Sequence, residues 1–162
     1  MADVLDAVSW WIYGTLKNDS TIVYLVNQLW GKDQTPSVVT SRTDEWIFES
    51  EAPAQTSTPY ILFDPISAVD NTANFANRVN TNAIYQIRVV GAGNSYSDLS
   101  VIYTQVDTLL AGVKQQVVTA NSGNVLIGSC IRSNAFKRMD NVDTVRYRCV
   151  GGLYRIVLSN SY

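Results

Sequence analysis

Hydrophobic positions repeat at the i, i+3, i+4, i+7 spacing of an amphipathic helix over residues 3–17. Asn18, Asp19 and Ser20 interrupt this pattern and offer an N-cap for a second helix, which repeats the spacing and meets Gly31 at its expected end. The connection is very short, so the pattern predicts a helical hairpin. The apolar stripe of the first helix consists of Val4, Leu5, Val8, Trp11, Ile12 and Leu16.

The pattern is lost over residues 32–58, where prolines, both signs of charge and small polar residues predict a long polar loop excursion. One short strand is expected within it, at Trp46–Phe48. Loops of this length tend to be functional or mobile. We therefore expect this segment to be mobile in the free subunit and to become ordered against a neighbour.

Two strands are predicted in the middle of the chain, at Pro59–Ile66 and Ala83–Val90, with a polar connection over residues 70–80. The second strand alternates: Tyr85, Ile87 and Val89 share one face, as expected of a strand that is buried on one side.

A further helix, from about Ser97 to Ala111, has the most regular apolar stripe in the chain. Ser95 and Asp98 are spaced as in a capping box before it, and Gly112 is placed to end it.

The last third predicts a long antiparallel hairpin over residues 123–160, with strands at Val125–Lys137 and Val142–Leu158 and a turn at Met139–Asn141. The apolar positions of the second strand change parity at Gly151-Gly152. A one-residue β-bulge at this glycine pair would explain the change.

These elements predict one α+β domain over residues 1–162, with an antiparallel or mixed sheet and helices packed on one face. No apolar run is long enough for a transmembrane helix, and the first residues carry acids and no early Lys or Arg, so we expect neither a membrane partner nor a secretory signal.

Composition excludes several kinds of chemistry. The chain has no histidine, which removes Ser-His-Asp and Cys-His nucleophile systems and the commonest general base. Its two cysteines cannot fill a four-thiolate zinc site. Lys and Arg number 12 against 14 acidic residues, unlike a dedicated nucleic-acid binder. We therefore expect no enzyme, with no catalytic, metal-binding or cofactor-binding residues.

Gly91 and Gly93 lie at a strand-to-helix turn, which is the setting of a phosphate-binding loop. A third glycine and a P-loop lysine are missing, so a tight turn into a capped helix is the favoured interpretation. A small anion-binding or nucleotide-binding module remains the alternative.

Several carboxylates lie in or beside polar connections, and solvated loop charges explain them better than a catalytic pair or a cation site. They are Glu45, Glu49, Glu51, Asp64 and Asp70.

Cys130 and Cys149 lie on opposite arms of the predicted hairpin. If its turn is centred near Met139-Asp140, the two face each other and a disulfide is conceivable. Two buried free thiols are favoured, because free cysteine behaves as a small apolar residue.

Charge is distributed unevenly along the chain. Residues 130–162 carry six basic and two acidic residues, a net of +4, whereas residues 1–129 carry six basic and twelve acidic residues, a net of −6. Arg146 and Arg148 share one face of their strand, so a basic ribbon is predicted there. It is either a solvated face or a contact for an acidic patch on another subunit.

Aromatic residues add a hint of interfaces. Trp10 and Trp11 are adjacent, so one apolar stripe cannot bury both, and Trp10 needs a covering loop or partner. The candidate interface residues are Trp10, Trp46, Arg138, Arg146, Arg148 and Arg155.

Taken in order, these segments resemble the tail terminator, or tail-to-head joining, proteins of long-tailed bacteriophages. The resemblance rests on the opening helical pair, Pro59–Phe63 as first core strand, the strand, glycine turn, tyrosine and helix of Tyr85–Leu110, and Arg146-Tyr147-Arg148 with the strand Leu153–Leu158. The polar segment 32–58 and the long final hairpin depart from the family.

This resemblance implies a structural virion protein of the tail or neck, assembled in the host cytoplasm. It implies a hexameric ring that caps the tail tube and joins it to the head connector. Partners would be further copies of itself, the tail tube protein and a head-completion protein, with DNA passing the lumen without sequence-specific binding. Another connector component, a head-closure protein or neck adaptor, is the alternative.

Overall fold

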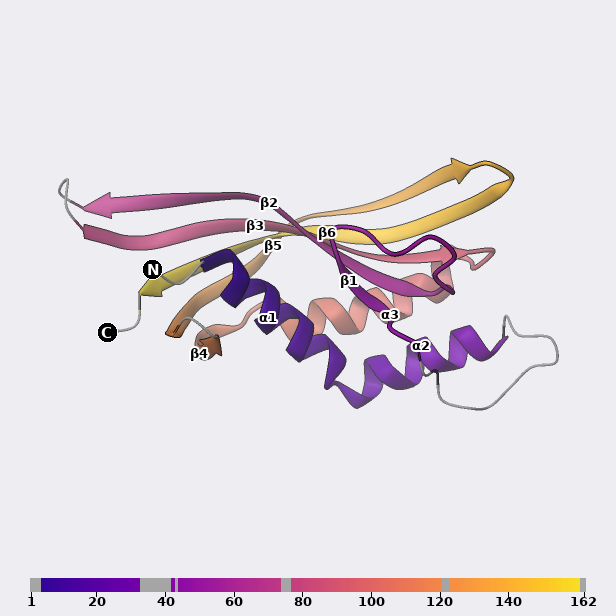
Figure 1. Ribbon diagram of the computed structural model, residues 1–162, viewed down its shortest axis with the longest axis horizontal. Coiled ribbons are helices and arrows are strands. Elements are labelled where there is room, and N and C mark those ends of the chain that lie inside the picture. Colours follow the sequence, from indigo (N-terminus) through magenta and orange to yellow (C-terminus); the bar gives the residue numbers. More distant parts are fainter. Residues whose placement is uncertain (1–3, 33–41, 43, 74–76, 121–122, 161–162) are drawn as a thin grey trace.

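The structure is a computed structural model that describes residues 4–32, 42, 44–73, 77–120 and 123–160. Within them the chain forms an α+β fold in which three helices lie against one face of a six-stranded mixed sheet, as predicted (Figure 1). The elements are α1 (Val4–Lys17), α2 (Ser20–Lys32), β1 (Ile47–Glu49), β2 (Tyr60–Ala73), β3 (Asn77–Ala92), α3 (Tyr96–Leu110), β4 (Lys114–Ala120), β5 (Gly123–Val142) and β6 (Val145–Asn160).

The first two helices form the predicted hairpin. Asp19 caps α2, because its side chain accepts a 2.8 Å hydrogen bond from the Ile22 amide. Trp11 is buried on the core side of α1 and its Nε1 donates to the Gln116 side chain on β4, 3.1 Å away. The helix α2 continues through Gly31 to Lys32, so Gly31 does not end it as predicted.

The sheet order is β1-β2-β3-β6-β5-β4, with β1 parallel to β2 and every other pair antiparallel. The hairpins β2–β3 and β5–β6 meet through the central β3–β6 pair, and their tips lie at opposite ends of the sheet (Figure 1). The sheet therefore has a helix-covered base and two projecting ends.

The hairpin β2–β3 is longer than predicted, whereas β5–β6 spans residues 123–160 as predicted but turns at a different position. Residues 70–73 and 77–80, within the predicted polar connection, belong to β2 and β3, whose register runs out to the pair Ala73–Asn77. The turn between β5 and β6 lies at Asp143-Thr144 rather than at Met139–Asn141, and Asp143 adopts a φ of 53° there. The predicted connection and the predicted turn were both wrong for the same reason. Strand residues outside the core need no apolar alternation, so polar strand residues there resemble a loop. Strand β4 was not predicted.

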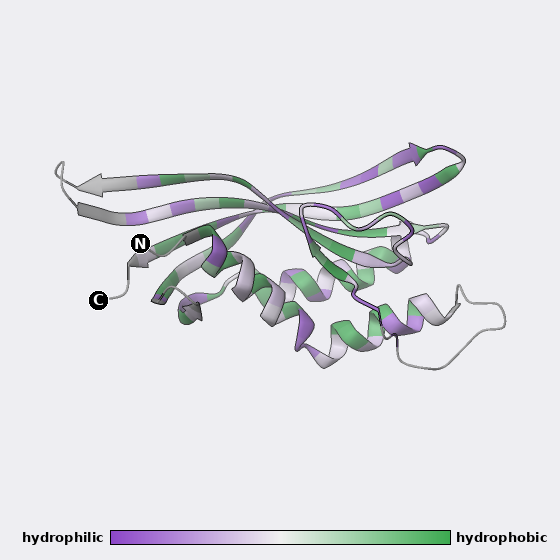
Figure 2. Ribbon diagram, in the orientation of Figure 1, coloured by the Kyte–Doolittle hydropathy of each residue, from purple (hydrophilic) through white to green (hydrophobic). Residues whose placement is uncertain are grey.

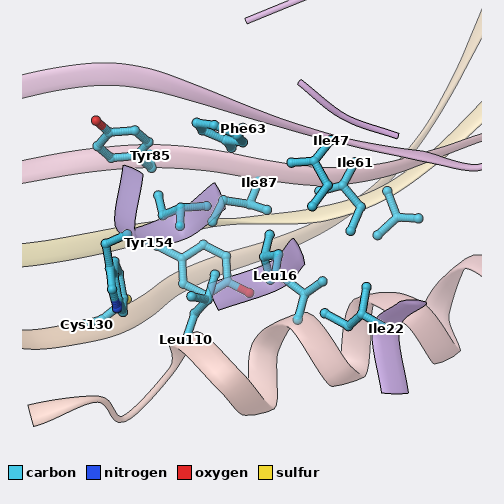
Figure 3. Packing of buried hydrophobic residues seen from close by; sticks show 14 of the residues in the cluster. Leu16, Ile22, Ile47, Ile61, Phe63, Tyr85, Ile87, Leu110, Cys130 and Tyr154 are labelled. Carbon is cyan, nitrogen blue, oxygen red and sulfur yellow. The ribbon is translucent and has the colours of Figure 1, made fainter. Parts of the chain in front are cut away.

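The main core lies between the helices and the sheet. Tyr85, Ile87 and Tyr154 from the two central strands are fully buried, and Leu16 and Leu110 meet them from the helices (Figure 3). Figure 2 shows green hydrophobic stretches along the helices that cover the sheet. Each fully buried side chain of this size stabilises the fold by about 1.5–3 kcal/mol.

A smaller apolar cluster of Leu62, Val90 and Cys149 packs on the opposite face, hereafter the outer face, where Ala52 and Phe48 lie against it. It explains the parity change in β6. The register of β3 with β6 is continuous past Gly151 and Gly152, so the predicted bulge is absent there. The strand simply alternates, and different faces are covered at its two ends.

The glycine pair serves close packing instead. A Cβ on Gly151 would lie 2.5 Å from the Ile87 carbonyl oxygen, and one on Gly152 would meet the Tyr103 hydroxyl. The register shifts of this hairpin occur in β5, between Ile127 and Ser129 and between Arg132 and Asn134.

Part of the polar segment 32–58 lies outside the described residues, namely 33–41 and 43, so its predicted mobility is not tested. Three of its described residues are buried. Arg42 is buried and donates to Asp44 and to the carbonyl oxygen of Ser57, and Trp46 and Ile47 enter the core. The predicted strand is confirmed as β1, one residue further on.

Among the described helices, none has both the length and the apolar character needed to cross a bilayer.

Candidate assembly surface

The far part of the β5–β6 hairpin, here called the arm (Ala135–Val150), forms the end of the sheet opposite the β2–β3 tip, and hydrophilic residues are frequent along it (Figures 1 and 2). The register of β5 with β6 shows which face of the sheet each side chain of the arm lies on. Residues opposite each other share a face, and Lys137 pairs with the core residue Val150, which fixes the helix side. The basic arm face, on that side, consists of Lys137, Met139, Asn141, Arg146 and Arg148.

The basic arm face is anchored at its base and free toward its tip. Lys137 Nζ lies 5.9 Å and Arg148 Cζ 5.7 Å from the centroid of the Tyr96 ring, at the start of α3. Arg148 Nη1 also donates a 2.9 Å hydrogen bond to the Asn94 carbonyl oxygen. Arg146 is exposed and Met139 is 48% exposed. The face therefore presents cations and an apolar side chain to the surroundings, with only its base held in place.

The structure brings together two of the four arginines selected from the sequence and separates the others. Arg146 and Arg148 share the basic arm face, whereas Arg138 pairs with Cys149 and Arg155 with Ile131 on the outer face. Arg138 Nε lies 2.7 Å from Asp140 Oδ1, and this hydrogen bond lowers the pKa of the Asp140 carboxyl. Arg138 is thus neutralised within its own strand.

Arg155 lies in a partly exposed apolar strip on the outer face, which no described helix covers. Its register partners are Ile131 and Ile84. Val69 and Val117, on the same face, are 58% and 59% exposed, and Ile131 is 54% exposed. Exposed apolar strips of this kind mark surfaces that contact other molecules.

A second surface combines an exposed tryptophan with acids. Trp10 is 57% exposed on α1, and its ring lies edge-on to Tyr13 with centroids 6.3 Å apart. These rings border an open groove of about 420 Å³ between α1 and β1. The groove, here called the Trp10 groove, is lined by Asp6, Trp10, Tyr13, Phe48, Glu49 and Phe63.

Hydrogen bonds hold the acidic side of the Trp10 groove in place. Ser9 Oγ donates to Glu49 Oε1 at 2.6 Å. Beside the groove, Tyr13 and Lys17 donate to Glu45 at 3.0 and 2.7 Å. Burial acts to raise the pKa of the Glu45 carboxyl, but the hydrogen bonds from Lys17, from backbone amides and from Tyr13 outweigh it and lower the pKa. The carboxylate therefore stays ionised around neutral pH.

Trp46, the remaining selected residue, offers no free surface in the subunit. It is 4% exposed and belongs to the main core, with Lys17 Nζ 5.0 Å from its ring centroid. Trp10 is exposed as its position beside Trp11 predicts. The partners of Trp10 in the groove, Phe48 and Glu49, were missed because they lie about forty residues away in a strand that only the fold places beside α1.

The glycine turn after β3 is the predicted tight turn into a capped helix. Gly93 has a φ of 77°, and Ser95 and Asp98 form the complete capping box of α3. Asn94 packs back against Gly91, and its carbonyl oxygen accepts from Arg148. The amides that an anion would need are thus partly used by the chain itself.

The acidic residues expected as solvated loop charges lie mostly in strands with partners, which corrects that expectation. Asp64 lies 3.3 Å from Arg88, and Asp70 accepts from Thr81 at 2.6 Å. Burial raises the pKa of the Asp64 carboxyl, and Arg88 opposes this. No group of three or more metal-ligating side chains occurs in the described part of the chain.

Both cysteines are free and buried, as favoured. They do not face each other: Cys130 pairs with Ile156 on the helix side and Cys149 with Arg138 on the outer face. Burial raises the pKa of the Cys130 thiol to about 12.

A buried polar network between α3 and the sheet was not predicted. The Tyr154 hydroxyl lies 3.0 Å from both the Tyr103 hydroxyl and Asp107 Oδ1, and Arg132 Nη1 donates to Asp107 at 2.8 Å. Burial, followed by the bond to Tyr103, raises the pKa of Tyr154. The network is closed by these partners, so it orders the core and presents no open catalytic group.

Comparisons with known proteins place the fold. No protein-family model matches the sequence, and no curated protein matches it. A solved structure entitled "Virion of native gene transfer agent (GTA) particle" contains a chain with the same fold. The match covers 99% of this chain and 100% of that chain, with a TM-score of 0.67 and 15% sequence identity. A second solved structure, at 13% identity over 90% of this chain and 98% of its own, has a TM-score of 0.43 and carries no argument.

Proposed function

We propose that this chain is a structural, non-enzymatic subunit of a phage-like virion and that it acts as a tail terminator. In this role it forms a closed ring, a hexamer, that caps the tail tube and joins it to the head connector. The observation that carries the proposal is the end-to-end agreement of its fold with a chain of a gene transfer agent virion. The agreement covers 99% of this chain and 100% of that chain, so it supports a shared architecture.

The surfaces of the subunit support an assembly role. It carries a projecting basic face, an apolar strip on the outer face and an acidic groove with an exposed tryptophan. These surfaces differ from one another, as heterologous contacts in a closed ring require. Arg, Met, Tyr, Trp and Phe, which occur in them, are enriched at protein interfaces.

The partners in this proposal are neighbouring copies in the ring, the tail tube protein and a head-completion protein. The subunit would act in the tail or neck of the virion after assembly in the host cytoplasm. DNA would pass through the lumen of the ring without sequence-specific contacts. The second candidate, a head-closure protein or neck adaptor, uses the same class of interfaces at a different level of the neck.

Electron microscopy of the purified protein mixed with tail tubes tests the proposal. A terminator should cap tube ends and stop their further growth, and native mass spectrometry of the released caps should give six copies. A protein that leaves tube ends bare and binds the connector instead would be the head-closure or adaptor component. A two-fold dimer in the assembled particle would contradict the ring.

A further inference from the structure

The basic arm face and the Trp10 groove are opposite in charge, and each includes exposed apolar surface. The arm face carries Lys137, Arg146 and Arg148 with no acidic residue between them on that face. The groove carries Asp6 and Glu49, both exposed. We propose that the arm of one subunit docks into the Trp10 groove of the next copy. This inference rests on the proposed ring, whose contact between neighbours it specifies.

Apolar surface supports the same pairing. Trp10 is among the most exposed large apolar residues of the described chain, and the groove beside it has Phe48 and Phe63 in its lining. On the arm, Met139 is 48% exposed between the cations. Docking would remove the Trp10 and Met139 side chains from water. A central apolar contact with a charged rim is the usual anatomy of a protein interface.

The contact must be between copies and not within one. The arm runs away from α1 toward the far end of the molecule, so its tip does not approach its own Trp10 groove (Figure 1). Each subunit thus offers one arm and one groove at separate places. A contact of this kind is head-to-tail, and it closes into a ring when the rotation between copies divides a full turn.

The basic arm face could contact either a neighbouring subunit or DNA, and the Trp10 groove favours the neighbouring subunit. The groove offers both carboxylates for the cations of the arm and apolar side chains for Met139. A phosphate backbone offers negative charge but no such apolar contact. We therefore assign the arm to the neighbouring subunit, and contact with lumenal DNA becomes an outcome of the test.

Cross-linking on assembled tails tests the contact directly. The double variant Trp10→Cys with Met139→Cys, treated with a short bis-maleimide, should give a covalent ladder up to the full ring on a denaturing gel. The control pairs Trp10→Cys with Val117→Cys, an equally exposed position on β4, and should give no ladder. The buried native thiols should not react in either variant.

Charge exchange tests the electrostatic part. Asp6→Lys and Arg146→Glu should each reduce tube capping about tenfold or more, because they place like charges in contact. The two changes together should restore capping. Asp6→Lys with Arg155→Glu, an exposed arginine on the outer face, should not restore it. Circular dichroism should show all variants folded.

The two proposals fail in different ways. If the wild type caps no tubes and forms no ring, the proposed function fails. If the wild type caps tubes but the Trp10–Met139 pair does not cross-link, or the exchange does not restore capping, the docking contact alone is wrong. Complete rings from Arg146→Glu that lose packaged DNA would also overturn it and assign the arm to the lumen.

Discussion

Strands β5 and β6 pass through two environments along their length. At the base, Tyr154, Ile156 and Cys130 are fully buried against the helices. In the arm, the same two strands remain paired, but most of their side chains are exposed, with Val142 at 56% and Val145 at 40%. The β5–β6 hairpin is therefore stabilised at its base by side-chain packing and in the arm mainly by hydrogen bonds between its two strands.

This difference separates stability from assembly. Substitutions at the base change buried apolar area and should lower the free energy of unfolding. Substitutions in the arm change exposed area and charge, so they should leave that free energy nearly unchanged while altering contacts with other molecules. The following predictions test this division, from the largest expected effect to the smallest.

Ile87→Ala should lower the free energy of unfolding by about 2–5 kcal/mol, because Ile87 is fully buried and its truncation leaves a cavity. Val142→Ala, an exposed apolar position in the arm, should change it by less than about 0.5 kcal/mol. Urea unfolding followed by circular dichroism measures both. Equal losses would show that the arm contributes to stability as the base does.

Gly152→Ala should lower the free energy of unfolding by about 1–3 kcal/mol through overpacking, since its Cβ would meet the Tyr103 hydroxyl and the Asn134 carbonyl oxygen. Adding Tyr103→Phe should recover part of the loss. Gly128→Ala is the matched control, because its Cβ would meet the nearest atom at 3.4 Å. Thermal unfolding compares the variants, and an equal loss at both glycines would refute the close-packing role of Gly152.

Alkaline pH should destabilise the helix-covered base of the sheet, because the buried Cys130 thiol resists ionisation. Its pKa of about 12 in the folded chain lies above the ordinary thiol value of 9.0, because burial disfavours the thiolate. The unfolded chain therefore loses its proton first, and the stabilising contribution, full below pH 9, declines as the pH rises toward 12.

The stability of Cys130→Ala should therefore fall less than that of the wild type over this range, by about 1 kcal/mol at pH 10. Denaturant unfolding at pH 8 and pH 10 measures the difference. Parallel pH profiles for the two proteins would show that the thiol does not contribute.

Tyr96→Ala should loosen the arm without unfolding the base. The ring lies within 6 Å of Lys137 Nζ and Arg148 Cζ, and exposed cation–π contacts stabilise by about 0.5–1 kcal/mol each. Hydrogen exchange should become several-fold faster in the arm and stay unchanged around Ile156. Faster exchange throughout the sheet would contradict a local tether.

The base was largely predictable from sequence. Apolar stripes with a helical period predicted the three helices. Alternation with a period of two correctly placed Tyr85, Ile87 and Val89 on one face of their strand, because burial imposes a period on the side chains. Ser95 and Asp98 predicted the start of α3 for the same kind of local reason.

The projecting ends and the groove were not predictable in the same way. Polar residues carry no period, so the sequence predicts a connection where the outer parts of β2 and β3 lie, and it predicts the final turn too early, before Asp143. Arg146 and Arg148 were grouped correctly by their spacing of two, whereas the Trp10 groove combines α1 and β1, which only tertiary packing brings together.

The pairing of β3 with β6 also has a consequence for how the chain folds. Each long hairpin joins strands that are neighbours in sequence, but the central pair joins Asn80 to Ser159 across almost half the chain. Closing so long a loop costs entropy before any contact repays it. The two hairpins are therefore expected to form early and their association to limit the folding rate, so that substitutions along the central seam slow folding while those in the arm do not.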